Sequence, residues 1–499
     1  MNPDAMIRNL LFVTGGLGMI LGGCQGASDK QEEQSEDKTD RQNPNIIYIL
    51  ADDLGYGDLS CYGQERFETP NIDRLAEEGM QFMQHYSGST VSAPSRSVLM
   101  TGQHTGHTPI RGNIEIQPEG QAPLPAEATT LAEVLKTEGY QTGAFGKWGL
   151  GIPGSEGDPN NQGFDHFFGY ICQRMAHRYY PKYLWNNDQK VMLEGNDWTK
   201  KATYAPDVIQ DSTLAFLEEN QDQPFFLYMP LIQPHAELQV PDDSIFNKYH
   251  GKYPEEPYVN KSKGSEYGPD LVIGKYASQE NPHATFAAMV KRIDLYVGQV
   301  VDKLKELGIE DETIIMFTSD NGPHMEGGAD PQFFDSNGKY RGHKRDLYEG
   351  GVRVPFIVKW PGVVKEGATS HHASAFWDIL PTVCEITGAE QPDDIDGISF
   401  YPELTGNGQQ PKHDYLYWEF HGQEGKQAII QGKWKAVRTQ VSQDPDGPLE
   451  LYNMEENPSE SRNVAEAHPE LVRQLDEMMD EVREPSEKFT FGLEAYEGE

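Results

Sequence analysis

Two short apolar segments that end in acidic residues constrain the fold of this chain most. Residues 45–50 (NIIYIL) and 313–318 (TIIMFT) contain no charged side chain. Such runs are typical of buried strands in a parallel sheet. Open α/β sheets place their ligands at the carboxyl ends of such strands. The polar residues that follow the two segments are Asp52, Asp53, Asp320 and Asn321.

Segments typical of strands and helices alternate up to about residue 406. In the segment 284–307, apolar residues recur at spacings of three and four, which predicts a long amphipathic helix. The alternation predicts a layered α/β domain. Further strands are expected at 141–145, 224–229 and 352–358, further helices at 69–80 and 131–135, and loops near the mouth of a site at 155–162 and 241–281.

The pattern changes near residue 407, where short strands separated by polar turns replace the alternation. A helix at 467–482 follows these strands, which predicts a smaller C-terminal α+β domain over 407–499 and leaves 43–406 as the main domain. The short strands are expected at 415–420, 427–430, 434–437 and 450–452.

The first 42 residues are typical of a targeting segment. Arg8 precedes an apolar stretch that ends in small residues at Cys24, and this stretch is too short to span a bilayer as a helix. It resembles a bacterial lipoprotein signal, which implies cleavage after residue 23, lipidation of Cys24 and an acidic flexible tether over 24–42. The alternative is an ordinary secretory signal with a chance cysteine. Either reading predicts an extracytoplasmic protein, and the lipoprotein reading predicts an anchor in the periplasm or on the outer-membrane surface.

Charge and cysteine content exclude several classes of protein. The formal net charge is −38, which disfavours nucleic-acid binding because that function needs a basic face. The chain has 4 cysteines and no Cys-x-x-Cys motif, so it is neither a zinc finger nor a disulfide scaffold.

The segment Ser92–Arg96 (SAPSR) combines a helix start with a cation. Pro94 fits the first turn of a helix, which places Ser92 among backbone N–H groups that favour an anionic ligand. Arg96 adds donors that match a tetrahedral oxyanion. A well-capped helix would explain the same residues, so the segment alone does not assign a function.

The stretch SAPSRSVLMTG, from Ser92 to Gly102, resembles the modification motif of type I sulfatases. Further matches occur in the family's order: Asp52-Asp53, Gly146-Lys147-Trp148, Asp320-Asn321-Gly322, the block 348–355 preceded by Lys344, and 434–463. The resemblance implies an alkaline-phosphatase-like α/β fold, with helices on both sides of a mixed sheet, and hydrolysis of sulfate esters. It also implies that a serine-type maturase oxidises Ser92 to formylglycine.

The resemblance further assigns roles in the site. The metal ligands would be Asp52, Asp53, Asp320, Asn321 and modified Ser92, and hard oxygen donors of this kind suit Ca²⁺, or alternatively Mg²⁺, rather than zinc. A serine hydroxyl without a neighbouring base is a poor nucleophile. In the family mechanism, one hydroxyl of the hydrated aldehyde attacks sulfur and the other later expels sulfate. Arg96, Lys147, Lys344 and His235 would hold the sulfate or assist the leaving oxygen.

One position departs from the family, which usually has histidine where this chain has Gly149. We hypothesise that His177 reaches into the vacated space. Gln173, Arg174 and, in a basic run, Arg345 are candidates to bind substrate. His104 and Arg111 either line the substrate cleft as well or have a folding role.

The sequence therefore predicts a sulfatase anchored to the membrane only through lipid and acting on a sulfated carbohydrate. Aromatic residues at 179–185 favour a sugar because aromatic rings stack on pyranose faces. Two alternatives remain open at this point. One is a phosphatase or phosphodiesterase of the same superfamily that uses unmodified Ser92, and the other is a catalytically dead glycan-binding lipoprotein.

Overall fold

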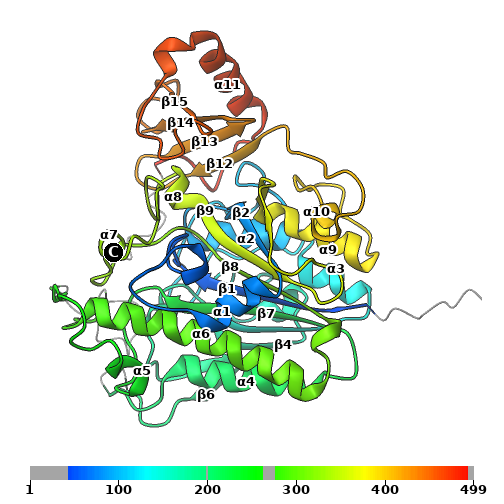
Figure 1. Cartoon of the computed structure of the whole chain (residues 1–499), viewed down its shortest axis with the longest axis vertical. Helices are drawn as coiled ribbons and strands as arrows, with labels where there is room; N and C mark the ends of the chain where they lie inside the picture. Colours follow the sequence, from blue (N-terminus) through cyan, green and yellow to red (C-terminus); the bar gives the residue numbers. More distant parts are fainter. Residues whose placement is uncertain (1–42, 198–199, 262–275, 493–499) are drawn as a thin grey trace, which may run out of the picture. The chain divides into compact units, whose positions relative to one another are not determined.

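The central feature of the computed structural model is a mixed sheet with helices on both faces (Figure 1). The structure describes residues 43–197, 200–261 and 276–492. The predicted signal, Cys24 and the tether lie outside the described residues. None of the helices in the described ranges has the length and apolarity to cross a membrane.

The large sheet has eleven strands in the described part of the chain, in the order β10-β2-β9-β8-β1-β7-β3-β4-β5-β6, with β11 beside β2. β1 lies between two parallel neighbours, β7 and β8, and all of its residues are buried. The strands are β1 Asn45–Asp52, β2 Met80–Tyr86, β3 Gln141–Lys147, β4 His166–Tyr170, β5 Tyr183–Asn186, β6 Gln189–Met192, β7 Phe225–Pro234, β8 Thr313–Ser319, β9 Arg353–Lys359, β10 Ala368–Ser370 and β11 Ser374–Ala375.

Two groups of helices cover this sheet (Figure 1). In one group α6 packs against α1 and α4, and in the other α2, α3 and α9 pack together. The long helix begins with proline in its first turn and ends at a glycine in the left-handed conformation, as expected for helix boundaries. The helices are α1 Pro70–Glu77, α2 Ser92–Thr101, α3 Leu131–Thr137, α4 Ala205–Glu219, α5 Ser244–Asn247, α6 Pro282–Leu307, α7 Pro331–Phe334, α8 Glu349–Val352, α9 Ile379–Thr387, α10 Tyr401–Thr405 and α11 Pro469–Glu481.

The fold class expected from the sequence is confirmed, with differences at element ends. The first helix stops at Glu77, and Met80 already belongs to strand β2, which the sequence analysis did not anticipate. Val352 closes a short helix, so β9 begins one residue later than expected. Strand β7 runs on to Pro234, where it pairs with Asp52 of β1 beyond a shift in register.

The smaller C-terminal domain holds an antiparallel sheet of β12 Leu416–Phe420, β13 Lys426–Gln431, β14 Trp434–Thr439 and β15 Glu450–Asn453. Helix α11 packs on this sheet. A buried ion cluster joins the two domains. The ammonium group of Lys435 on β14 lies 3.0 Å from Glu349 on α8 and 3.0 Å from Glu460. The boundary at residue 406 stays a prediction.

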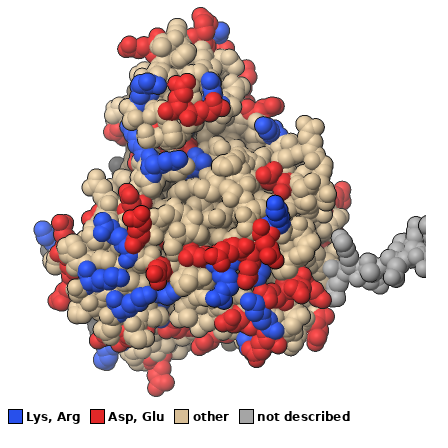
Figure 2. Space-filling model, in the orientation of Figure 1, with Lys and Arg blue, Asp and Glu red and all other residues tan. Residues whose placement is uncertain are grey.

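The surface charge does not show where the Lys and Arg side chains predicted for the site lie. On the face shown in Figure 2, groups of Lys and Arg are interspersed with Asp and Glu. Arg96, Lys147 and Lys344 are instead 1%, 1% and 5% exposed. The site is therefore a buried group of opposite charges within an acidic protein.

Candidate functional site

The acidic residues expected at one sheet edge do meet there. β1 and β8 run parallel with Ala51 beside Ser319, so the residues that follow both strands emerge together. The backbone N–H of Asp53 donates to Oδ1 of Asp320 at 3.1 Å, and Nδ2 of Asn321 donates to Oδ1 of Asp53 at 2.7 Å. Asp53 itself adopts a left-handed backbone conformation, with φ 64°.

Ser92 begins helix α2 and faces the acidic group. Its hydroxyl donates to Oδ1 of Asp52 at 3.1 Å and accepts from Nζ of Lys147 at 3.2 Å. The hydroxyl of Ser95, one turn along α2, donates to the carbonyl oxygen of Asp320 at 2.6 Å and fixes the helix to the end of β8. Residue 92 is therefore held between a carboxylate and an ammonium group.

Arg96 and Lys147 neutralise the acidic group from the side of α2 and β3. Arg96 lies 2.8 Å from Oδ2 of Asp320, and its guanidinium also donates to the carbonyl oxygen of Lys147. Nζ of Lys147 lies 2.6 Å from Oδ2 of Asp52. Burial lowers the pKa of Lys147, although Asp52 opposes this effect. Burial, followed by the charge of Asp52, raises the pKa of Asp320.

Lys344 and His235 approach from the opposite side. Nζ of Lys344 lies 2.8 Å from Oδ2 of Asp53 and 3.0 Å from Nε2 of His235. Burial disfavours the charged amine, but the carboxylates of Asp53 and Glu326 outweigh that effect and raise the pKa of Lys344. Burial, and then the charge of Lys344, holds the pKa of His235 well below its usual value.

Burial favours the neutral form of His235, although its Nε2 also lies 3.4 Å from Oδ2 of Asp53. Its Nδ1 faces the carbonyl oxygen of Ala236, which can only accept a hydrogen bond. The proton of the neutral ring therefore lies on Nδ1, and Nε2 accepts from the ammonium group of Lys344. Of the two residues, Lys344 carries the available proton.

Two further residues near this pair were missed by the sequence analysis. The ring of His324 lies 5.6 Å from that of His235, and its Nδ1 lies 3.1 Å from a carboxylate oxygen of Glu326. Glu326 also forms an ion pair with Arg345, one of the predicted substrate-binding residues, whose role stays a prediction. The sequence did contain a signal for His324 and Glu326, because they form a second group of polar residues shortly after Asp320 and Asn321.

The residues present fit a divalent cation. Oδ1 of Asn321 is buried and has no hydrogen-bond partner among the described residues. The carboxylates of Asp52, Asp53 and Asp320 and the Ser92 oxygen belong to the same contact network. Ligand atoms of Asp52, Asp53 and His235 lie within 4.8 Å of one another. Carboxylate and amide oxygens are donors that Ca²⁺ and Mg²⁺ prefer.

The structure describes different surroundings for the other predicted substrate-binding residues. His104 donates its backbone N–H to Asp396, and its ring stacks on that of His107. Arg111 pairs with Glu419 of β12 at 3.2 Å. Arg174 donates to Glu115 at 3.1 Å. The described contacts of His104 and Arg111 thus hold parts of the main domain together and connect it to the C-terminal sheet. That either residue binds substrate stays a prediction.

The side chain that lies over Gly149 belongs to Gln173. A Cβ atom added at Gly149 would stand 2.1 Å from Nε2 of Gln173. The ring of His177 instead stacks on that of His235, with centroids 4.7 Å apart. Burial, followed by the charge of Lys147, holds the pKa of His177 well below its usual value. The catalytic role of His177 stays a prediction.

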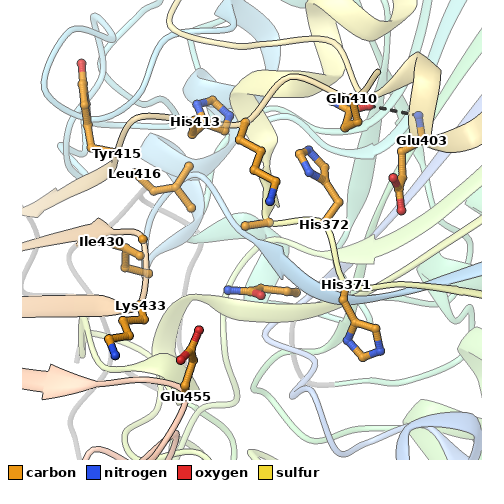
Figure 3. A pocket seen from close by; sticks show the side chains of 14 residues that line it. His371, His372, Glu403, Gln410, His413, Tyr415, Leu416, Ile430, Lys433 and Glu455 are labelled. Atoms are coloured by element: carbon orange, nitrogen blue, oxygen red, sulfur yellow. Dashed lines mark hydrogen bonds between the residues drawn. The ribbon is translucent and has the colours of Figure 1, made fainter. Parts of the chain in front are cut away.

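A separate cavity of about 650 Å³ lies between the main domain and the C-terminal sheet (Figure 3). None of the cluster residues named above lines it. Its lining includes His371, His372, Glu403, Gln410, His413, Tyr415, Lys433 and Glu455.

Comparison with curated proteins finds sulfatases over most of the chain. An N-acetylgalactosamine-6-O-sulfatase of Bacteroides thetaiotaomicron is 30% identical over 93% of this chain and 97% of that protein. Human arylsulfatase A is 31% identical over 87% of each chain.

Solved structures match the fold over a similar extent. A structure described as Ps i-CgsB in complex with k-i-k-neocarrahexaose gives a TM-score of 0.73 at 28% identity and covers 91% of this chain and 96% of that one. The C-terminal family of N-sulphoglucosamine sulphohydrolase matches residues 338–485, and the sulfatase family itself matches residues 44–389. This chain belongs to the sulfatase family.

Proposed function

We propose that this protein hydrolyses a sulfate ester on a sulfated carbohydrate, with a formylglycine made from Ser92 by a serine-type maturase. The observation that carries the proposal is the position of the Ser92 oxygen, between the carboxylate of Asp52 and the ammonium group of Lys147. One relative named above is an N-acetylgalactosamine-6-O-sulfatase and one similar structure was solved with k-i-k-neocarrahexaose, which supports a sugar substrate here.

The proposal includes a divalent cation, Ca²⁺ or Mg²⁺, held by Asp52, Asp53, Asp320, Asn321 and modified residue 92. A cation in this place supplies positive charge that favours ionisation of an oxygen on residue 92. The unpartnered oxygen of Asn321 supports this assignment.

The buried cations supply what a sulfate group requires. Lys147 contacts the Ser92 oxygen from one side, and Lys344 approaches Asp53 from the other. Buried fixed charges stabilise developing negative charge more strongly than charges in water do. Lys344 holds the proton nearest to His235, so we assign protonation of the leaving sugar oxygen to Lys344 and the orientation of its amine to His235.

The proposed location is extracytoplasmic, with lipidated Cys24 as the only membrane anchor in the periplasm or on the outer-membrane surface. The apolar stretch before Cys24 and the polar segment after it support this location. Labelling with a lipid precursor, in the full chain and in Cys24→Ala, tests the anchor.

The test of function uses the chain produced with and without a serine-type maturase. Peptide mass should show the loss of two hydrogens at residue 92 only with the maturase. Only that material should release sulfate from a panel of regiodefined sulfated mono- and oligosaccharides. Full sulfate release by protein that retains serine contradicts the formylglycine assignment.

Matched substrates separate the rival activities. Hydrolysis of phosphate esters but not of sulfate esters by matured protein identifies a phosphatase. Binding of a sulfated sugar without sulfate release by any matured sample identifies a binding protein. Ser92→Ala is the control for contaminating sulfatases in both assays.

A further inference from the structure

The side chain of Gln173 fills the space that a side chain at position 149 would need. Gly149 has φ 78°, a conformation that L side chains rarely adopt, and the 2.1 Å approach of Gln173 to a Cβ at this position leaves no room for one. The backbone N–H of Gly149 also donates to the carbonyl oxygen of Ile171 at 3.0 Å, which holds the two segments together. A side chain reaches this space from position 173 and not from position 149.

A second glutamine supports the first. Oε1 of Gln121 accepts from the backbone N–H of Gln173 at 3.2 Å, and the backbone N–H of Gln121 donates to the carbonyl oxygen of Gly151 at 2.9 Å. Gln121 and Gln173 are only 1% and 3% exposed. The two carboxamides therefore lie in a packed wall beside residues 149–151.

Both carboxamides have unused donors. Nε2 of Gln121 and Nε2 of Gln173 are buried without a hydrogen-bond partner among the described residues. Leaving a buried donor unsatisfied destabilises the folded state, so each one requires an explanation. Oδ1 of Asn321 is likewise unpartnered, and there a bound cation would satisfy it.

The segments that carry these groups also carry site residues. Gly149 lies two residues after Lys147, which contacts the Ser92 oxygen. Gln173 lies four residues before His177, which stacks on His235. Gln173 packs against Gly149, so it lies between the segment that follows Lys147 and the segment that leads to His177.

We infer that Gln173, held in place by Gln121, is a substrate-binding residue that donates an N–H to an oxygen of the bound sulfated sugar. This inference rests on the proposed function. A carboxamide does not titrate, so this contact holds the substrate at every working pH and transfers no proton. Proton transfer is then left to Lys344 and to residue 92.

The first test compares Gln173→Met and Gln121→Met with Gln210→Met. Methionine keeps the bulk of glutamine without its donors. Gln210 is an equally buried glutamine on α4, whose amide donates to the carbonyl oxygen of Tyr296. We expect Gln173→Met to raise KM at least tenfold with no loss of thermal stability, Gln121→Met to raise it less, and Gln210→Met to keep wild-type KM. Wild-type KM in Gln173→Met overturns the inference.

The second test uses Gln173→Glu, which has nearly the same shape. Its carboxylate cannot donate, whereas its protonated form can. We expect kcat/KM of this variant, relative to wild type, to rise as pH falls. A ratio that does not change with pH argues for a purely structural role and against the inference.

Binding measurements separate this inference from the proposed function. If matured wild type releases no sulfate, the proposed function fails, and calorimetry with inorganic sulfate and with the desulfated sugars of the same panel still tests Gln173. Weaker sulfate binding by Gln173→Met assigns the donor to a sulfate oxygen, and weaker binding of the desulfated sugar assigns it to a hydroxyl. Unchanged binding of both ligands overturns the inference.

Discussion

Nζ of Lys147 lies 2.6 Å from Oδ2 of Asp52, a residue 95 positions earlier in the chain. The same ammonium group donates to the Ser92 oxygen, so this pair sets the charge around residue 92. Replacing Lys147 leaves the Asp52 carboxylate without this cation, and truncating one partner of a buried pair is costly.

We therefore expect Lys147→Ala to lower kcat/KM of matured protein at least a hundredfold and to lower its melting temperature. Lys136→Ala is the matched control, because its ion pair with Asp165 is 2.7 Å long but largely exposed. Exposed pairs contribute about 0–1 kcal/mol, so the control should keep wild-type activity. Sulfate release and thermal melts measure both effects, and a fully active Lys147→Ala contradicts the assigned role.

Removal of the divalent cation should inactivate and destabilise the protein. A ligand at a hundred times its dissociation constant adds about 2.7 kcal/mol to the free energy of unfolding. We expect a chelator to lower the melting temperature of wild type, and Ca²⁺ or Mg²⁺ to restore it together with activity.

Asn321→Ala is the corresponding variant for the cation site, because it removes the unpartnered oxygen together with the hydrogen bond from Nδ2 to Asp53. Its melting temperature should respond to the cation less than that of wild type. A chelator that leaves wild-type stability and activity unchanged contradicts the assigned ligands.

The sequence was sufficient to place the acidic residues but not the contacts around them. Apolar runs that end in Asp52 and Asp320 predicted neighbouring strands, because parallel strands finish at one edge and the side-chain pattern specifies burial. The stack of His177 on His235 depends on how two loops pack, and no local pattern encodes that arrangement.

The side chain over Gly149 illustrates the same limit. The glycine was visible in the sequence as a departure, and His177 was the expected substitute. Whether position 173 or 177 reaches that space depends on the backbone path between β4 and the short turn at 175–177, which is irregular and has no periodicity to read. The structure places Gln173 there.

The ion cluster between the domains leads to a stability prediction. Lys435 is fully buried between Glu349 and Glu460, and the two glutamates are also fully buried. Lys435→Met should destabilise the protein by about 3–5 kcal/mol, because two buried carboxylates lose their shared cation.

Adding Glu460→Gln to Lys435→Met should recover part of that loss, since one uncompensated charge is removed while Glu349 keeps Arg353 at 2.8 Å. Lys433→Met, at an exposed position on the same turn, should change the free energy of unfolding by less than about 0.5 kcal/mol. Denaturant titration measures all three variants. Equal stability of Lys435→Met and wild type argues against a structural role for the cluster.

Asp58 should make stability depend on pH. Burial raises its pKa from 3.8 to about 7, and its Oδ2 accepts from the backbone N–H of Gly55 at 2.8 Å. The folded state therefore binds a proton more tightly than the unfolded state. The contribution of Asp58 to the free energy of unfolding is thus present below pH 4 and is lost as pH rises through about 7.

Asp58→Asn keeps an acceptor for Gly55 and does not titrate. Relative to wild type it should gain up to about 4 kcal/mol between pH 4 and pH 8, at about 1.4 kcal/mol per unit. Denaturant titrations across this range check the slope, and parallel curves for the two proteins contradict the raised pKa.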